Sequence, residues 1–391
     1  RHKYAERYKF VLVDEYQDTN YVQQRIVWQL TKERQLVCVV GDDAQSIYGF
    51  RGANIDNILD FQSLYKGAKL FKLEQNYRST RLIVQAANSL ISHNKRQIHK
   101  DVFSKNSEGE RVKIVPTYSD KEEAHVVCKN ITSIKRKDGC QYSDFAILYR
   151  TNAQSRCFEE ALRKQNIPYR VYGGLSFYQR KEIKDVISYF RLVVNPNDEE
   201  AFRRVINYPS RGIGNTTMAK LMTTAVNDSV SMWEIIAHPE QHGTGVNKGT
   251  QAKLTAFHDL ISSFQDRQAT DDAYTLGMDI IKKSGIYADL YSDTSVEAIS
   301  RQENLEELMN GIKDFVDSRR EQGIPGTTIS DYLQEVSLMS DLDSDGKDDD
   351  NKVMLMTIHS AKGLEFKTVF VVGMEENIFP SPLCTDTVRK L

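Results

Sequence analysis

Two short apolar segments near the start of the chain each run directly into acidic residues. Residues 10–13 are followed by Asp14 and Glu15, and residues 36–40 are followed by the Gly-Asp-Asp segment 41–43. Apolar runs without alternation are typical of strands that are buried on both faces of a parallel sheet. A helical pattern separates the two runs. We therefore expect two neighbouring strands of one sheet, with both polar loops at the same edge.

The remainder of the chain changes from mixed to helical and back. A helix is expected over 81–93, with Ser79 or Thr80 as its N-cap. Strand patterns then alternate with helical patterns at 121–134 and 153–165, and the strands are expected at 112–116, 145–149 and 169–172. From about 175 to 340 nearly every segment has helical periodicity, for example 183–194, 217–226, 252–265 and 304–321. An acidic run at 341–350 is interpreted as a solvated linker, and it leads to strands expected at 353–358 and 368–373.

The carboxylates that close the first apolar run can serve a nucleotide. Ligands of such sheets collect at the carboxyl ends of the strands. One carboxylate there can hold Mg²⁺ on the phosphates, and its neighbour can orient or deprotonate an attacking water. Asp14 and Glu15 can equally begin the helix that follows, because acidic residues are favoured at helix starts. From these two residues alone, both interpretations stand.

The loop after the second strand, residues 41–53, contains an amide, two aromatic rings and a guanidinium group: Gln45, Tyr48, Phe50 and Arg51. An amide at one end can sense a phosphate, and aromatic side chains at the other end can stack on bases. The alternative is an ordinary turn whose rings pack into the core. In the next polar block, Arg78 can reach a terminal phosphate as a bidentate donor and Tyr77 can stack on a base.

Composition indicates an ordinary globular protein. The 391 residues are 40% hydrophobic and 27% charged, which suits about two or three domains. The net charge of -2 does not indicate a nucleic-acid binder, so such a function must rest on local side chains. The 5 cysteines form no CxxC pair, which favours reduced structural thiols in the cytoplasm over disulfides or zinc. No apolar run is long enough to span a membrane, so no membrane partner is expected. The start at Arg1 suggests a piece of a longer protein.

Seven blocks of the sequence closely resemble motifs of the UvrD/PcrA/Rep-type superfamily 1A DNA helicases. The blocks DEYQDTN, GDDAQSIYGFRGA and LEQNYRST are similar to motifs II, III and IV in order and spacing. The match is extended by AILYRTNAQSR (146–156), the segment 172–196, YPSRGIGNTT (208–217) and the motif V-like MTIHSAKGLEFKTVFVVGMEENIFP (356–380). The resemblance spans nearly the whole chain and is loosest between about 225 and 345.

The resemblance implies a catalytic role for four residues. Asp14 would ligate Mg²⁺, and Glu15 would activate the hydrolytic water. Gln45 would couple the γ-phosphate to the DNA-facing end of its loop. Arg78 would act as an arginine finger that neutralises charge in the transition state.

It also implies residues that bind the nucleotide and the DNA. Tyr77 would stack on adenine, Glu365 would bond the ribose hydroxyl, and Gly363 would let the backbone approach closely. The residues implied in DNA contacts are Tyr48, Phe50, Arg51, Arg150, Asn152, His359, Arg211, Gly212 and Gly214. The last three lie in a segment that resembles a duplex-binding hairpin. From the residues alone, an ordinary turn between helices is the simpler interpretation of that segment.

Three departures from the family pattern affect these expectations. Phe50 stands where many members carry tryptophan, and Ser176 stands where a basic residue is common. The 391 residues contain no G-x-x-x-x-G-K-[ST] loop, whose backbone N–H groups and lysine would hold the phosphates. Motif VI, with a second arginine, should lie downstream of Leu391. We therefore expect this chain by itself to bind ATP very weakly and not to hydrolyse it.

The fold class implied is α/β, with two RecA-like parallel-sheet motor domains, the first partial, and an all-helical inserted subdomain. Residues 1–72 would belong to the first motor domain and 73–174 to the second. Residues 175–345 would form the helical insertion, and 346–391 would return to the second motor domain.

The leading functional hypothesis is a large fragment of an ATP-dependent 3′–5′ DNA helicase. Its cofactors would be ATP and Mg²⁺, and its partners would be single-stranded DNA, the junction with duplex, and repair or replication proteins. ATP would favour closure between the motor domains and hydrolysis would release it. The alternatives are an ATPase-inactive module that binds DNA or protein, and the helicase part of a helicase–nuclease complex.

Overall fold

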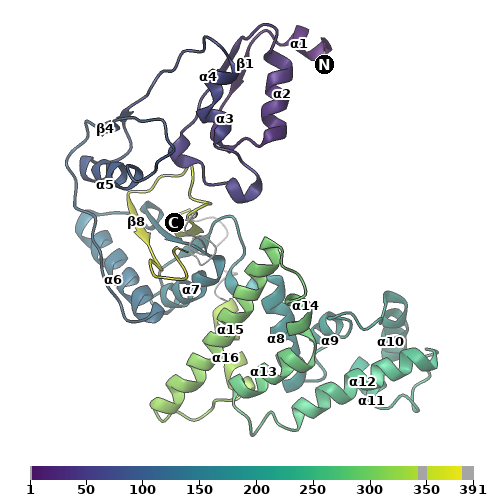
Figure 1. The fold of residues 1–391 in the computed structure, drawn as a ribbon. Helices are drawn as coiled ribbons and strands as arrows, with labels where there is room; N and C mark the ends of the chain where they lie inside the picture. The colour runs from purple at the N-terminus through teal and green to yellow at the C-terminus, as the bar shows by residue number, and fades with distance from the viewer. Residues whose placement is uncertain (1, 342–349, 381–391) are drawn as a thin grey trace. The chain divides into compact units, whose positions relative to one another are not determined.

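The computed structural model describes residues 2–341 and 350–380, and the chain divides into two compact units (Figure 1). The N-terminal unit comprises residues 1–116 together with 362–365. The larger unit comprises residues 117–361 and 366–391. The four domain ranges expected from the sequence stay a prediction. The acidic run interpreted as a linker lies almost entirely outside the described residues.

The N-terminal unit is built on a two-stranded parallel sheet. Strand β1 (Val11–Val13) pairs in parallel with β2 (Val37–Val39), which confirms that the two apolar runs are neighbouring strands. Helix α2 (Tyr21–Thr31) connects them. It begins at Asn20, which forms a reciprocal capping box with Gln23. A short helix, α1 (His2–Arg7), precedes β1.

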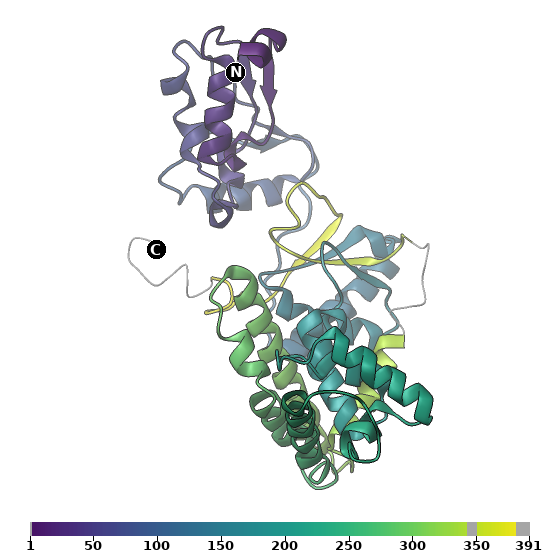
Figure 2. The same ribbon diagram turned by 90° about the vertical axis from the view of Figure 1, so that its right-hand side faces the viewer.

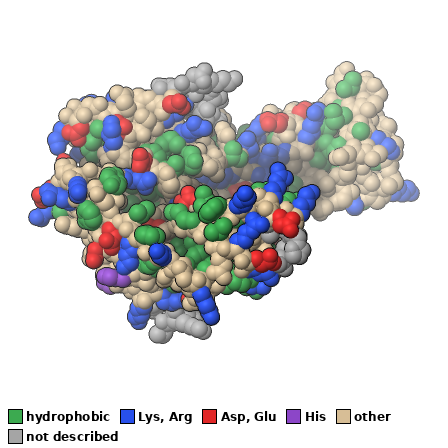
Figure 3. All heavy atoms as spheres, turned by 90° about the horizontal axis from the view of Figure 1, so that it is seen from above, with side chains coloured by type: hydrophobic (Ala, Val, Ile, Leu, Met, Phe, Trp, Pro, Cys, Tyr) green, Lys and Arg blue, Asp and Glu red, His purple; other side chains and the backbone are tan. Residues whose placement is uncertain are grey.

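The expectation that these strands are buried on both faces is wrong. Val11 and Val13 are half-buried, but Leu12 between them is 77% exposed and Phe10 is 68% exposed. Successive side chains of a strand point to opposite faces, so one face of the sheet is covered and the other is open. In the part of the chain that the structure describes, α2 packs on β1. Hydrophobic side chains that reach the surface are visible in the space-filling view (Figure 3).

Short elements complete this unit. The 3-10 turns η1 (Tyr16–Asp18), η2 (Asp43–Gln45) and η3 (Gly49–Arg51) form the two polar loops. They are followed by α3 (Asp56–Leu59), α4 (Phe61–Leu64), β3 (Gln75–Asn76), α5 (Arg81–Ile91) and β4 (Phe103–Ser104), and β3 pairs in parallel with β4. The core centres on Tyr16, which is fully buried and packs edge-on against Phe61 at 5.6 Å between ring centroids.

Helix α5 starts where the sequence predicts, but without a side-chain cap. Thr80 occupies the N-cap position and makes no capping hydrogen bond. The N–H groups of Arg81 and Leu82 instead donate to the main-chain oxygens of Ser107 and Glu108, at 3.1 and 3.2 Å. A passing backbone segment thus satisfies the helix N-terminus.

The strand expected over 112–116 is not formed. Its side chains alternate as a strand would, yet Val112 is 64% exposed and Ile114 is 93% exposed. A strand requires a neighbour that accepts and donates main-chain hydrogen bonds, and this segment is irregular. The sequence pattern of 112–116 predicted a strand wrongly, because no neighbouring strand pairs with this segment.

The larger unit contains a four-stranded parallel sheet in the order β6-β7-β5-β8. Its strands are β5 (Phe145–Tyr149), β6 (Tyr169–Val171), β7 (Val353–Thr357) and β8 (Thr368–Val371), close to the predicted ranges (Figure 2). The helices α6 (Asp120–Asp138) and α7 (Ser155–Lys164) confirm the other predictions here. Strand β5 is central, and four of its five residues are fully buried, because it has neighbours on both sides.

Between residues 175 and 341, the regular elements that the structure describes are all helical, as predicted for 175–340. The α-helices are α8 (Lys181–Val194), α9 (Glu199–Val205), α10 (Asn215–Asp228), α11 (Met232–Ala237), α12 (Lys248–Gln265), α13 (Ala273–Lys283), α14 (Ile286–Leu290), α15 (Val296–Glu321) and α16 (Ile329–Asp341) (Figure 1). Helix α8 contacts α9, α12, α13, α15 and α16, and its buried side chains run through one continuous apolar core. None of the helices in the described ranges is long and apolar enough to cross a membrane.

A buried polar cluster joins the sheet to this helical body. Glu159 of α7 is 1% exposed and accepts from the Ser155 hydroxyl at 2.7 Å and from the Phe177 N–H at 3.1 Å. Arg180 donates to Ser155 and to Asn304 of α15, both at 2.8 Å. The sequence gives no signal for this cluster, because its members are far apart along the chain.

Candidate functional site

Both polar loops of the N-terminal unit leave the same edge of the β1–β2 sheet. The N–H of Val40 donates to the oxygen of Val13 at 2.8 Å, and the N–H of Tyr16 donates to the oxygen of Val40 at 3.0 Å. These bonds continue the parallel ladder past the last paired residues. The prediction that the two loops share an edge is confirmed.

Asp14 and Glu15 lie exposed at this edge. The Glu15 N–H donates to Asp14 Oδ1 at 2.8 Å. Glu15 has a φ of 51°, in the left-handed region that a side chain with a Cβ adopts at a cost of about 1 kcal/mol or more. This conformation ends the strand abruptly and turns the chain into η1. Asn20, rather than the acidic pair, caps the following helix, so the alternative in which Asp14 and Glu15 only start that helix is wrong.

Gln17 connects the two loops and was missed from the sequence. Its side chain is fully buried: Nε2 donates to Glu15 Oε2 at 2.6 Å, and Oε1 accepts from the Asp42 N–H at 3.1 Å. Its main-chain oxygen accepts from the Ser46 hydroxyl at 3.2 Å. A Cβ on Gly41 would lie 2.4 Å from Gln17 Oε1, so a larger residue there would displace the buried amide. One amide thereby fixes the Glu15 carboxylate to the second loop.

Gln45 lies exposed at the start of the second loop. Its Nε2 donates to Asp42 Oδ2 at 2.8 Å, which holds the amide within the loop. The Asp42 carboxylate also accepts from the Ala44 N–H at 3.1 Å and so caps η2. The amide predicted to sense a phosphate is therefore held by an anion.

The aromatic end of the loop is open to a ligand. The rings of Tyr48 and Phe50 lie 6.2 Å apart, and the Arg51 guanidinium lies 5.9 and 5.5 Å from their respective centres. Phe50 is 53% exposed, so the alternative in which both rings pack into the core is wrong for Phe50. A shallow pocket of about 240 Å³ lies beside them and is lined by Asp18, Asn20, Gln23, Tyr48, Arg51 and Ala53.

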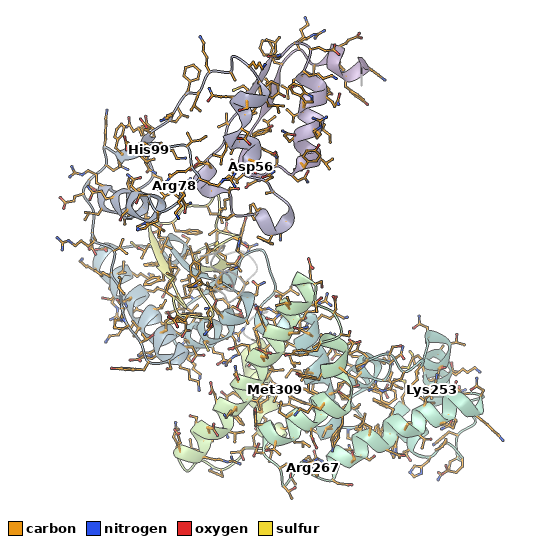
Figure 4. All side chains as sticks on the ribbon, viewed as in Figure 1. Asp56, Arg78, His99, Lys253, Arg267 and Met309 are labelled. Carbon is orange, nitrogen blue, oxygen red and sulfur yellow. The ribbon has the colours of Figure 1, made fainter. Side chains whose placement is uncertain are left out.

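Arg78 and Glu365, two residues predicted to contact ATP, meet in the N-terminal unit. Arg78, labelled in Figure 4, donates from Nε to Glu365 Oε2 at 2.6 Å, and both side chains are more than half exposed. Asn76 fixes the backbone of this turn, since its Oδ1 accepts from the N–H groups of Arg78 and Ser79 at 3.0 and 2.8 Å. Tyr77 beside them is 77% exposed and available for stacking. An exposed ion pair of this kind contributes about 0–1 kcal/mol, so Arg78 can leave it for a phosphate.

Lys362, just before Gly363, is a second residue that sequence reasoning missed. Its side chain is 9% exposed and pairs with Asp18. Its Nζ donates to the main-chain oxygen of Gln45 at 3.0 Å and lies 3.6 Å from Glu15 Oε2. The same ammonium lies 5.2 Å from the centre of the Tyr48 ring. Its position within a motif V-like block was the only available signal.

In the larger unit, Arg150 and His359 come together at one edge of the sheet. Arg150 follows β5 and His359 follows β7, which are adjacent parallel strands. Arg150 Nη1 lies 3.5 Å from His359 Nδ1. The nearby Asn152 is exposed in η5 (Asn152–Gln154). The structure thus brings together two of the residues predicted to contact DNA.

The Arg211 side chain is half-buried, and its terminal nitrogens are hydrogen-bonded within the fold. Its Nη2 donates to the Tyr189 hydroxyl at 2.7 Å and to the Ser284 oxygen at 3.0 Å. Its Nη1 donates to main-chain oxygens of the 205–209 turn, including that of Tyr208 at 3.0 Å. These bonds give the Arg211 side chain a structural role, and the DNA contact implied for Arg211 stays a prediction. Gly212 and Gly214 are exposed and stay predicted DNA contacts.

Across residues 2–341 and 350–380, one set of potential metal ligands lies within 4.8 Å: Asp120, Cys157 and Glu307. The Cys157 thiol donates to Asp120 Oδ2 at 2.8 Å, and Glu307 accepts from Arg156 Nε at 2.7 Å. Burial raises the pKa of Cys157, so the thiol stays protonated. These pairings favour a structural cluster over a metal site, which agrees with the expectation of structural thiols.

Comparisons with known proteins agree with this geometry. Residues 71–388 match the model of the UvrD-like helicase C-terminal domain, and residues 1–66 match the UvrD/REP helicase N-terminal domain. The chain is similar to the ATP-dependent DNA helicase PcrA of Staphylococcus epidermidis, with 42% identity over 377 residues that cover 96% of this chain and 51% of that protein. The protein of the same name from Staphylococcus aureus is 40% identical over 377 residues, 96% of this chain and 50% of its own length. The chain spans about half the length of these curated relatives. On the matched domains and these identities, the chain belongs to the UvrD-like helicase family.

Proposed function

We propose that the full-length protein carrying this chain is an ATP-dependent DNA helicase that moves 3′ to 5′ on single-stranded DNA. The observation that supports this most strongly is the pair of hydrogen bonds by which the buried Gln17 side chain connects Glu15 to the loop of Gln45 and Tyr48. A carboxylate, an amide and a stacking ring are thereby held on one rigid edge. The relatives bear the name of ATP-dependent DNA helicases, which supports the same proposal.

The edge suits magnesium and a nucleotide triphosphate. Asp14 presents an exposed carboxylate with one oxygen bonded to the Glu15 N–H, and carboxylate oxygens are the ligands that Mg²⁺ prefers. Asp14 would hold Mg²⁺, which would supply positive charge beside the phosphates of the nucleotide. Glu15, adjacent and fixed by Gln17, would orient the attacking water and accept its proton.

Other side chains of the N-terminal unit would complete the nucleotide site. Arg78 would leave Glu365 and donate to the terminal phosphate, while the released Glu365 would accept from the ribose hydroxyl. Exposed Tyr77 would stack on the base. The exposed Gln45 amide would bond the terminal phosphate and so couple it to the DNA-facing end of its loop.

Single-stranded DNA would be held by stacking and by cationic side chains. Phe50 and Tyr48 offer ring faces, with Arg51 beside them. Stacking of a base on an aromatic side chain contributes about 1–3 kcal/mol. Arg150 and His359 in the larger unit would contact the strand through its phosphates.

The test is strand separation by the full-length protein on duplexes with either a 3′ or a 5′ single-stranded tail. Unwinding of the 3′-tailed duplex with ATP, but not with a non-hydrolysable analogue, is expected. Phe50→Ala should weaken single-strand affinity by about 1–3 kcal/mol. Equal unwinding without hydrolysable ATP, or a preference for the 5′ tail, would contradict the proposal.

A further inference from the structure

A lysine from a distant loop is clamped between the two carboxylates of the second polar loop. Lys100 Nζ lies 2.6 Å from Asp42 Oδ1 and 2.6 Å from Asp43 Oδ1. Its side chain is 21% exposed and that of Asp43 is 3% exposed. Lys100 and Asp43 are therefore largely buried. An ion pair in the protein interior is stronger than one on the surface.

The loop that carries Lys100 is itself fixed. The Ile98 N–H donates to Asp43 Oδ2 at 2.9 Å, and the Asp101 N–H donates to Glu74 Oε1 at 2.9 Å. Arg96 pairs with Asp56. His99, labelled in Figure 4, directly precedes Lys100. Lys100 is thus presented from both sides by anchored backbone.

Asp42 is the branch point that leads from this lysine to the proposed catalytic groups. Its Oδ2 accepts from Gln45 Nε2 at 2.8 Å, and its N–H donates to Gln17 Oε1 at 3.1 Å. Gln17 in turn holds Glu15 at 2.6 Å. Two contacts therefore connect Lys100 with Gln45, and three connect it with Glu15, with the contact to Asp42 shared by both.

The ionisation of the pair is consistent with a permanent clamp. Burial alone would raise the pKa of Asp42, but hydrogen bonds from Lys100 and Gln45 hold it below its usual range. Burial alone would lower the pKa of Lys100, but Asp42 and Asp43 hold it above its usual range. At neutral pH both groups are charged.

We propose that Lys100 is a positioning residue for ATP hydrolysis, which it serves by fixing Asp42 and, through Asp42, the Gln45 amide and the Glu15 carboxylate. This inference rests on the proposed function. Lys100 also neutralises Asp42 and Asp43, which otherwise place two negative charges beside a site for an anionic nucleotide. Glu15 and Gln45 act on the attacking water and the transferring phosphoryl group, so displacement of either slows chemistry more than binding.

The experiment measures DNA-stimulated ATP hydrolysis by the full-length protein and its variants Lys100→Met, Lys100→Arg and Asp42→Asn. Lys100→Met should lower kcat at least tenfold and change the KM for ATP less than threefold. Lys100→Arg retains the charge and should restore kcat to within threefold of the wild type. Lys66→Met, an exposed lysine of the same unit, is the matched control and should leave both constants unchanged.

A double substitution separates positioning from a general loss of stability. If Lys100 acts through Asp42, the combined variant Lys100→Met/Asp42→Asn should be no slower than the slower single variant. The inference is overturned if Lys100→Met keeps kcat within twofold of the wild type. It is also overturned if KM rises in step with the fall in kcat, or if arginine restores nothing. If the wild-type protein hydrolyses no ATP at all, the proposed function fails, and that result is distinct from each of these.

Discussion

Replacing Arg211 with methionine tests whether this residue stabilises the fold or contacts DNA. The guanidinium lies over the Phe257 ring at 5.2 Å and donates to five main-chain oxygens and the Tyr189 hydroxyl. Methionine fills much of the same space but donates no hydrogen bond. The carbonyls of the 205–209 turn would then lose their partner.

The size of the effect follows from the number of donors. The two terminal nitrogens of arginine carry four N–H groups, and each hydrogen bond contributes about 0.5–1.5 kcal/mol net. Because the side chain is only half-buried, water replaces part of this, and we expect a loss of about 3 kcal/mol. A cooperative unit of about 270 residues has an unfolding entropy of about 0.6 kcal/mol per degree, so the Tm should fall by about 5 °C.

The assay is thermal unfolding of the 391-residue chain, followed by circular dichroism, with Arg203→Met as the control. Arg203 is a nearby arginine whose side chain is 51% exposed and lies 3.8 Å from Glu199. Its loss should lower the Tm by less than about 2 °C, since such surface pairs contribute about 0–1 kcal/mol. An unchanged Tm for Arg211→Met, combined with weaker duplex binding, would refute the structural role and restore the DNA contact.

Three further substitutions probe the packing of both units. Gly41→Ala should destabilise the N-terminal unit by about 1–3 kcal/mol because its Cβ meets Gln17, whereas Gly49→Ala, with open space around it, should be nearly neutral; equal urea midpoints would contradict this. Glu159→Ala should lower the unfolding free energy of the larger unit by about 3–5 kcal/mol, because it leaves buried positive charge without its partner. A loss below 1 kcal/mol in urea titration would argue against a structural role for Glu159. Asp272 caps α13; burial alone would raise its pKa, but bonds from Thr275 and Arg320 hold it below 3.8. Its contribution is therefore present above pH 3.8 and lost as the pH falls through the native pKa, so the Tm difference between wild type and Asp272→Asn should shrink there.

The sequence predicted the elements well where local pattern and tertiary packing agree. Four of the five apolar residues of β5 are buried because strands flank them on both sides, and the helical periodicity of 175–340 matches a real helical core. The segment 112–116 has an equally good strand pattern but no partner strand, and pairing is a property of the whole fold. The prediction that β1 is buried on both faces was wrong for a related reason, because burial depends on what covers each face of a sheet.

The loops of the candidate site were located from the sequence, but the contacts that connect them were not. The positions of Asp14, Glu15 and Gln45 followed from strand ends and motif resemblance, and the structure brings their loops to one edge. Gln17 was signalled only by its position in the motif II-like block, and Lys100 carried no signal, because a buried amide and a paired lysine look like ordinary polar residues in the sequence. The internal bonds of Arg211 were not predicted either, because a motif specifies a residue type and position, while the direction of its side chain depends on neighbouring carbonyls.

The central claim is that the edge of β1 and β2 performs ATP hydrolysis through Glu15. The most direct measurement is single-turnover hydrolysis of ATP by the full-length Glu15→Gln variant in the presence of single-stranded DNA, alongside its nucleotide affinity. Glutamine keeps the shape and can still bond Gln17, but it cannot accept a proton from water. The account predicts nucleotide affinity within about threefold of the wild type and a hydrolysis rate at least about a hundredfold lower, since general-base catalysis contributes about 10²–10⁴. Hydrolysis at the wild-type rate would contradict it.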